Sequence, residues 1–325
     1  MIALKTLFII TVSTSRFVFP GVPAAVNLPQ TAKQPAVKSL TAEVASNVAA
    51  PMGATASLTV PDGLKTASEL RLQITDSLPK PPAGAQAPAL VEYWGCGRGI
   101  GADQPRITRP APPPASPKEI PDKSYAYWPP PNSEPLDAAA ELPGTYAFKT
   151  NYCGGSRVTL SKDQDFLDPV DITSSGEFDL EKPITIRWKP VPNAVGYLLR
   201  AYSGDTTRTV TWTSSVKPEL AASIEYRPVT KSDLEDYIKQ GVLLPSYVVS
   251  CTIPAGVFKG CEGVILVMTA VGKDVRQQDE NVETWVVIRS TASVPLHSAP
   301  LRGLTSRPIP RAQIDSGMMA SNRRP

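Results

Sequence analysis

The sequence predicts an all-β protein made of two β-sandwich domains, with one short inserted helix and a flexible segment at each end. Its 325 residues include 35 prolines, about twice the usual share. The prolines cluster, which is typical of linkers and strand edges, because proline removes a hydrogen bond from a helix or a sheet. Short segments of alternating apolar and polar residues, bounded by turn residues, favour strands. A chain of this length can bury two separate cores.

Residues 1–25 resemble an export signal peptide. Lys5 supplies a positive start, Leu7 to Val12 begins an apolar run, and Val22-Pro23-Ala24 ends it with small residues. Arg16 interrupts the apolar region, so a disordered or anchoring N-terminus is the alternative. No later run approaches the roughly 18–20 apolar residues of a membrane span. We therefore expect an exported protein, periplasmic or extracellular, with no transmembrane span in the mature chain.

The two ends of the mature chain are predicted to be disordered. Residues 26–52 form a leader without aromatic residues, and residues 297–325 form a basic tail with five arginines and one acidic residue, Asp315. The formal charge of +3 therefore lies in the tail, and the rest of the chain is close to neutral. A neutral body lacks the basic surface of a nucleic-acid binder, so we expect no nucleic-acid partner.

A first β-domain is expected over residues 53–178. Leu70 to Ile74 alternates like a half-buried strand, and Ala89 to Trp94 continues the pattern. A proline-rich insertion, about residues 105–135, interrupts the domain and is expected to run over the surface as polyproline II. The insertion carries three aromatic residues, Tyr125, Tyr127 and Trp128.

A glycine-rich stretch, Gly97 to Ala102, matches the dinucleotide-binding pattern G-x-G-x-x-A. Phosphate binding would require a helix directly afterwards, and the prolines between Pro105 and Pro117 forbid one. The glycines instead indicate a tight turn or bulge between two strands, with Cys96 fastening the turn to another part of the sheet. We expect no cofactor.

The four cysteines favour disulfides, because an even number in an exported chain is typical of an oxidising compartment. Their spacing fits no metal motif, and the single histidine, His297, lies near the tail. Proximity along the chain pairs Cys251 with Cys261 and Cys96 with Cys153, although sequence alone leaves the connectivity open.

The second domain is expected over residues 179–296. Ile184 to Ala201, ITIRWKPVPNAVGYLLRA, combines a tryptophan, a proline turn and a Gly-Tyr pair. This stretch resembles the B and C strands of a fibronectin type III domain, while Val264 to Gly272 resembles the F strand and Glu283 to Ile288 the G strand. The resemblance covers residues 178–295 and implies an immunoglobulin-like sandwich with Trp188 in its core.

The resemblance to fibronectin type III departs from the family's pattern at Val264. Val264 stands where the family's F strand usually begins with a corner tyrosine, so that corner is lost or built differently. The combination of this domain with the upstream YWGCG, Tyr93 to Gly97, is also similar to uncharacterised exported proteins of Gram-negative bacteria, which implies no activity.

Residues 230–241 predict one amphipathic helix inserted between strands. Ser232 and Glu235 fit a capping box, and Gly241 fits a C-terminal stop. We expect its apolar face to cover an open end or edge of the sandwich, with partner docking as the alternative. The apolar face consists of Leu234, Tyr237 and Ile238.

Two groups of residues suggest ligand sites. An acidic cluster is spaced unlike an EF-hand, so a solvated loop is expected, with calcium binding as the alternative. The cluster consists of Asp163, Asp165, Asp168 and Asp171. Trp212 lies on a strand suited to solvent exposure. Core or cross-strand packing is expected for this side chain, and stacking on a sugar ring beside Tyr202 or Tyr226 is the alternative.

No catalytic residues are predicted, because a Ser-His-Asp or Cys-His site would need His297 from the tail. We expect an exported, non-catalytic structural or protein-binding protein of the bacterial envelope or exterior. Its partner would be a protein, an envelope polymer or a second copy, with Ala36 to Leu40 as a strand donor and the tail arginines attracting anionic polymer. A carbohydrate-binding module is the alternative, and an enzyme using acidic residues is the third hypothesis.

Overall fold

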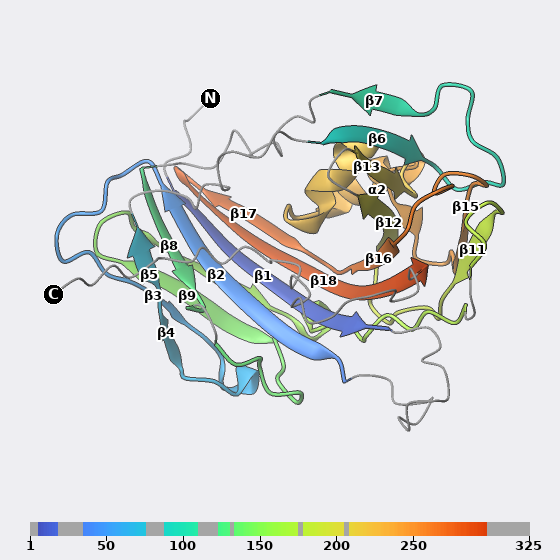
Figure 1. Ribbon diagram of the computed structural model, residues 1–325. Coiled ribbons are helices and arrows are strands. Elements are labelled where there is room, and N and C mark those ends of the chain that lie inside the picture. The colour runs from blue at the N-terminus through green and yellow to red at the C-terminus, as the bar shows by residue number, and fades with distance from the viewer. Residues whose placement is uncertain are drawn as a thin grey trace, which may run out of the picture.

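The computed structural model describes residues 6–18, 35–75, 88–109, 123–130, 133–174, 178–204 and 208–297 (Figure 1). Within these ranges the chain forms a 12-stranded sheet, a four-stranded sheet and a two-stranded sheet, with only short helices between strands. The prediction of an all-β fold is therefore confirmed.

The 12-stranded sheet, called here the large sheet, runs the length of the molecule. Its order is β5 (Gln73–Thr75), β8 (Ser124–Trp128), β2 (Val37–Ser46), β1 (Thr6–Phe17), β18 (Val282–His297), β16 (Val264–Val271), β12 (Gly196–Gly204), β13 (Arg208–Thr213), β6 (Ala89–Trp94) and β7 (Arg106–Thr108). Two further strands lie off this path: β14 (Leu244–Pro245) pairs with β12, and β17 (Val275–Asp279) pairs with β18.

The two smaller sheets cover the inner face of the large sheet. The four-stranded sheet has the order β10 (Gly155–Leu160), β9 (Gly144–Thr150), β3 (Ala56–Thr59) and β4 (Glu69–Arg71), and the two-stranded sheet pairs β11 (Ile184–Arg187) with β15 (Ser250–Ile253). Figure 1 shows β3, β4 and β9 below β1 and β2, with β11 and β15 at the opposite end. The structure thus contains two sandwiches that share one sheet.

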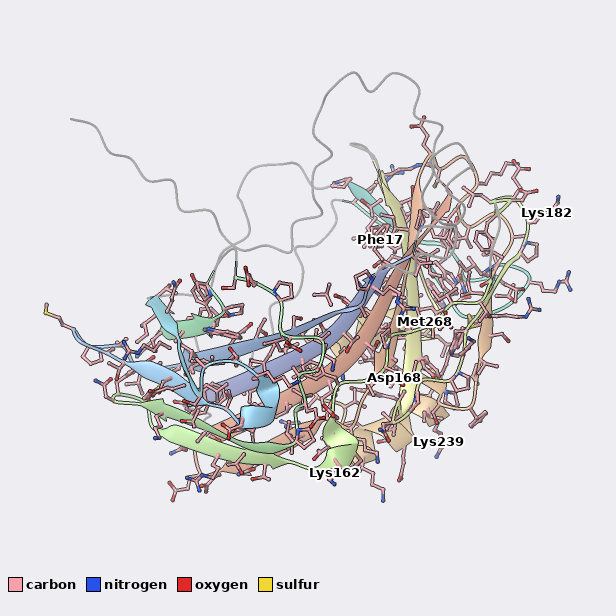
Figure 2. All side chains as sticks on the ribbon, turned by 90° about the horizontal axis from the view of Figure 1, so that it is seen from below. Phe17, Lys162, Asp168, Lys182, Lys239 and Met268 are labelled. Carbon is pink, nitrogen blue, oxygen red and sulfur yellow. A yellow bond between two sulfur atoms is a disulfide. The ribbon has the colours of Figure 1, made fainter. Side chains whose placement is uncertain are left out.

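Alternation along the strands fills a common core between the layers. Phe8 of β1 packs against Phe148 of β9 with 4.8 Å between ring centroids, and Trp188 packs edge-on against Tyr197 of β12 at 5.5 Å. All four side chains belong to the same buried cluster. Figure 2 shows Met268 of β16 in the interior, whereas Lys162, Lys182 and Lys239 lie at the periphery.

The N-terminal segment that resembles an export signal is strand β1, in the middle of the large sheet. It pairs antiparallel with β2 and parallel with β18, from Thr6 opposite Val282 to Phe17 opposite Ser293. Removal of residues 1–25 would take away this strand and separate β2 from β18. The interpretation of residues 1–25 as a removable signal is therefore corrected for residues 6–17, which belong to the folded chain. Residues 1–5 and 19–25 lie outside the described residues.

The predicted disordered leader also contains a strand. Residues 37–46 form β2, which lies between β1 and β8. Ala36 to Leu40 therefore serves the chain's own sheet and is not a free donor for a second copy. Residues 26–34 of the leader and residues 298–325 of the tail lie outside the described residues.

The predicted boundary near residue 178 holds for the inner layer but not for the large sheet. The four-stranded sheet comes from residues before the boundary and the two-stranded sheet from residues after it. In the large sheet, however, β6 pairs in parallel with β13 across the boundary. The prediction of two separate domains is corrected to two sandwiches with one common sheet.

The proline-rich insertion is not polyproline II throughout. Ser124 to Trp128 forms β8, which pairs with β2 and β5, and Arg106 to Thr108 forms β7. Tyr125 is buried in this strand. Residues 110–122 and 131–132 lie outside the described residues.

The short helices cover the outer face of the large sheet, not an end or edge. They are α1 (Pro218–Ala221), η3 (Ala222–Glu225) and α2 (Lys231–Lys239), and their apolar residues pack on Leu198 of β12 and Val271 of β16. Gly241 has a φ of +68°, as expected for a helix stop. The capping box is formed by Thr230 and Asp233, which replaces the predicted pair Ser232 and Glu235. Two other 3-10 turns, η1 (Asp62–Leu64) and η2 (Lys162–Gln164), lie in the first sandwich.

The glycine-rich stretch is the turn between β6 and β7, and Cys96 fastens it to the inner layer. Cys96 forms a disulfide with Cys251 of β15. Next to it the Gly97 N–H donates to the Thr252 carbonyl at 2.9 Å, and Gly95 has a φ of +83°, which suits glycine. The predicted role of Cys96 is confirmed, but its partner is a strand of the second sandwich.

The predicted disulfide pairings are wrong, because Cys153 and Cys261 are free thiols. Cys153 lies beside Thr6, which pairs with Val282 at the start of β18. Cys261 precedes Val264, which pairs with His297 at the end of β18. β18 has 16 residues, roughly 50 Å of strand. The two thiols therefore cannot join each other within one chain, since bridged cysteines need Cα atoms within about 7 Å.

The stretches that resemble fibronectin type III are strands at the expected places. The expected B strand is β11, and the expected C, F and G strands are β12, β16 and part of β18, which are neighbours in the large sheet. Trp188 is 3 % exposed, as predicted. These pairings are compatible with the family's sandwich, and the family resemblance itself stays a prediction.

We predict that Phe8→Ala lowers the free energy of unfolding by about 3–5 kcal/mol, because it leaves a cavity against Phe148. Urea unfolding of the full chain measures this, with Ser15→Ala of the same strand as the control, expected within about 0.5 kcal/mol of the parent. Equal midpoints for Phe8→Ala and the parent would show that β1 is not part of the folded core.

We predict that Cys96→Ala, or Cys251→Ala, lowers the free energy of unfolding by about 2–5 kcal/mol, because the disulfide closes a loop of 155 residues. Cys261→Ala is the control and removes no cross-link. Denaturant unfolding without reductant, together with thiol counting by mass spectrometry, tests both. A Cys96–Cys153 or Cys251–Cys261 peptide in the digest contradicts the connectivity.

Candidate functional site

The candidate functional site is a polar cleft between β10 and β17. β10 is the edge strand of the four-stranded sheet, and β17 pairs only with β18 among the described strands. The cleft has a volume of about 660 Å³, within the range of about 300–1,000 Å³ typical of small-molecule sites. It lies where the two layers of the first sandwich open at their edges.

A bulge in the large sheet produces the β17 side of the cleft. β16 pairs with β18 as far as Val271 opposite Arg289, and pairing resumes with Val275 opposite Val286. Three residues, 272–274, therefore face two, which makes a β-bulge. Gly272 is required here, because a Cβ at this position would lie 2.8 Å from the Ile288 side chain.

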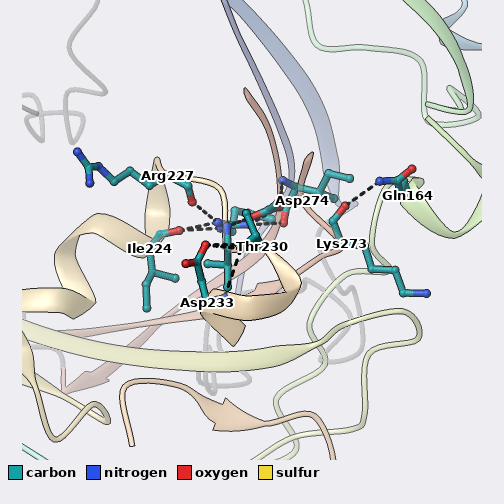
Figure 3. Close-up of polar contacts among 10 residues, drawn as sticks. Gln164, Ile224, Arg227, Thr230, Asp233, Lys273 and Asp274 are labelled. Carbon is teal, nitrogen blue, oxygen red and sulfur yellow. Dashed lines mark hydrogen bonds and ion pairs between the residues drawn. The ribbon is translucent and has the colours of Figure 1, made fainter. Parts of the chain in front are cut away.

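A buried ion pair fixes the bulge (Figure 3). The Arg289 Nη1 donates to both carboxylate oxygens of Asp274 at 2.7 Å, and only 3 % and 0 % of the two side chains is exposed. The carboxylate also accepts the N–H groups of Ile288 and Val229, each at 2.8 Å. Burial raises the pKa of Asp274, while Arg289 and these N–H groups act in the opposite direction.

The same arginine connects the bulge to the helical insertion. Its Nε and Nη2 donate to the Ile224 carbonyl at 2.9 and 2.7 Å, and Nη2 also donates to the Arg227 carbonyl at 2.8 Å. Arg289 therefore joins the helices on the outer face to the strand that forms the cleft.

The inner face of β17 presents unpaired polar side chains to the cleft. Gln277 lies opposite Thr284 and Asp279 opposite Val282, so all four share this face. Within the described part of the chain, the side chains of Gln277, Asp279, Glu280 and Asn281 make no hydrogen bond or ion pair. They are available to a bound molecule.

The opposite wall comes from the turn before β10 and from β10 itself. The hydroxyls of Ser156 and Thr284 hydrogen-bond across the two sheets. Tyr152 lines the cleft; its hydroxyl is buried without a partner among the described residues, and burial raises its pKa. The Cys153 thiol lies 3.2 Å from the Thr150 hydroxyl, and the Thr6 hydroxyl donates to the Cys153 carbonyl at 3.1 Å.

Contacts from η2, which follows strand β10 of the four-stranded sheet, join that sheet to the bulge. Lys273 donates to Asp163 at 2.7 Å and its carbonyl accepts from Gln164 at 3.3 Å. The hydrogen bond from Lys273 lowers the pKa of Asp163 to about 2. These surface contacts connect the two sides of the cleft at the bulge.

Trp212 packs in the core, as expected, and the alternative of a sugar-stacking site is wrong at this residue. This side chain is 1 % exposed, and its Nε1 donates to the Gly95 carbonyl at 3.0 Å. The reason is that β6 pairs alongside β13, so the strand is not an exposed edge. Tyr202 and Tyr226 remain at the surface, 39 % and 40 % exposed.

The acidic cluster is not gathered around one point. Asp163 pairs with Lys273, and Asp171 pairs with Lys189 at 2.9 Å. The Asp165 carboxylate accepts the N–H groups of Leu142 and Phe166, at 2.8 and 2.7 Å. The Asp168 side chain is exposed, and only its backbone carbonyl is engaged, accepting from the Ser290 hydroxyl at 2.8 Å. The described residues contain no group of three metal-ligating side chains, so the calcium alternative at Asp163, Asp165 and Asp168 has no support among them.

Sequence reasoning missed the residues of the cleft. Gln277 to Asn281, QQDEN, has the composition of a solvated turn between two strands. A smaller cavity of about 240 Å³ lies near Gly204 and Cys261, at the other end of β18. Neither position carries a motif of known spacing.

Comparison with protein families, with curated proteins and with solved structures finds no match. The described residues include no helix of the length and apolar character needed to cross a membrane.

We predict that Asp274→Ala lowers the free energy of unfolding by about 3–5 kcal/mol, because it leaves the Arg289 charge buried without its partner. Asp279→Ala, five residues further along and exposed, is the control and should stay within about 0.5 kcal/mol of the parent. Urea unfolding followed by tryptophan fluorescence measures both. Equal losses for the two variants would contradict the role of the pair.

Proposed function

We propose that this chain is an exported, non-catalytic binding protein of the bacterial envelope or exterior, which holds its partner in the cleft between β10 and β17. The observation that carries the proposal is the row of polar side chains on the inner face of β17 that have no partner among the described residues. Gln277, Asp279 and Glu280 are exposed and Asn281 is half-buried, and all four line a preformed cleft with the volume of a small-molecule site, so a ligand can bind them without breaking an internal bond.

The disulfide supports export. Cys96–Cys251 joins the β6–β7 turn to the inner layer, and structural disulfides persist in secreted and periplasmic proteins but are rare in the cytosol. The role of residues 6–17 as strand β1 means that this support does not depend on cleavage of an N-terminal signal.

Side-chain contacts, not strand addition, suit this edge. Arg276 and Asp279 place charges of both signs on β17, and charged edge strands resist pairing with another chain. The partner is therefore expected to enter the cleft and use its side chains. We no longer expect self-association by donation of a leader strand, because residues 37–40 of the proposed donor already pair within the chain as part of β2.

The test is co-sedimentation of the full-length, oxidised protein with purified Gram-negative cell envelope at low and high salt. We predict that the double variant Gln277→Ala/Asn281→Ala binds at least tenfold less, because the cleft loses two hydrogen-bonding amides. Gln278→Ala is the matched control, since its side chain lies on the opposite face, across from Glu283.

Three outcomes contradict the proposal. If the protein does not bind the envelope, or if the double variant and Gln278→Ala reduce binding equally, the cleft is not the binding site. If mass spectrometry detects chemical conversion of the bound material, the protein is not a non-catalytic binder. Free thiols at Cys96 and Cys251 in protein recovered from cells remove the argument for export.

A further inference from the structure

We infer that the cleft between β10 and β17 binds a neutral saccharide chain, an inference that rests on the proposed binding function of this cleft. The site differs from the alternative stacking surface at Trp212, which is buried. It is defined by Gln277, Asp279, Glu280 and Asn281 on one wall and by Tyr152 on the other.

The hydrogen-bonding groups match those of a sugar. Each sugar hydroxyl donates one hydrogen bond and accepts others. Gln277 and Asn281 offer amides that both donate and accept, whereas Asp279 and Glu280 offer acceptors only. Planar side chains of this kind can contact two neighbouring hydroxyls at once. Because these four groups have no partner in the described chain, they lose no internal bond when the ligand binds.

The cleft also has apolar surface for the C–H groups of a sugar ring. Tyr152, Val48 and Val282 line it together with the polar residues. The Tyr152 hydroxyl is itself buried, so this residue offers the ligand its ring and not its hydroxyl. Saccharides combine polar edges with apolar faces, and the cleft supplies polar side chains for the first and the Tyr152 ring for the second.

Charge selects against acidic ligands. Asp279 and Glu280 face one basic residue, Arg157, among the charged residues that line the described cleft. The excess of negative charge repels uronic acids, phosphates and sulfates, while an uncharged sugar is unaffected. The volume of about 660 Å³ equals that of about 20 water molecules, enough for several sugar rings.

The wall is preorganised. The ion pair between Asp274 and Arg289 fixes the start of β17, and the hydrogen bond between Ser156 and Thr284 holds the two sheets together at the cleft. A backbone held in this way loses little conformational freedom on binding, so the entropic cost is limited to ordering the exposed side chains.

The experiment uses the full-length oxidised protein on an array of neutral and acidic glycans, followed by calorimetry. The best neutral tetrasaccharide, tetragalacturonate and a tetra-alanine peptide are the probes. We expect the neutral tetrasaccharide to bind at least tenfold more tightly than the other two. Gln277→Ala and Asn281→Ala should each weaken it at least tenfold, while Gln278→Ala changes it less than twofold.

A charge variant tests the selectivity. Asp279→Asn/Glu280→Gln keeps the size of both side chains and removes both negative charges. We expect it to narrow the affinity gap between the neutral tetrasaccharide and tetragalacturonate at least threefold. Melting temperatures within a few degrees of the parent confirm that each variant is folded.

The results separate this inference from the proposed function. If no neutral glycan binds, if the acidic glycan or the peptide binds as tightly, or if Gln278→Ala weakens binding as much as Gln277→Ala, the saccharide inference is overturned. If envelope binding still depends on Gln277 in that case, the cleft remains a binding site for another class of partner. If neither glycan nor envelope binds, both fail.

Discussion

Arg289 buries a guanidinium with only 3 % of its side chain exposed, and such a charge costs several kcal/mol unless its donors are satisfied. Its partners come from separate parts of the chain: the Asp274 carboxylate in the bulge and the carbonyls of Ile224 and Arg227 in the helical insertion. Because the bulge begins β17, the inner wall of the cleft and the helices on the outer face depend on the same side chain. The two faces of the large sheet are thus mechanically connected at this point.

Features with local signals were predictable from the sequence. The alternation that ends in Trp188 and the stop at Gly241 agree with the structure, whereas the capping box moved by two residues because Thr230 and Asp233 have the same spacing as Ser232 and Glu235. Long-range pairing carries no local signal. A short apolar run before Arg16 fits an export signal and a buried strand equally well, and only the pairing of β1 with β18 decides between them.

The candidate site could not be predicted for the same reason. Gln277 and Asp279 alternate as a strand would, but their exposure to a cleft depends on β10, which is more than 100 residues away in the chain. The stacking hypothesis failed at Trp212 because β6 pairs with the strand that carries it. In the same way Cys251 pairs with Cys96 instead of its sequence neighbour Cys261, since the β6–β7 turn lies against β15.

The parallel pairing of β1 with β18 sets the order in which the chain can fold. Thr6 leaves the ribosome long before Val282, its neighbour in the sheet, has been synthesised. The apolar side chains of β1 therefore stay without their final partner during most of translation, and closing so long a loop is slow. We expect the nascent chain to need a chaperone that shields this strand, and the large sheet to close only when synthesis is nearly complete.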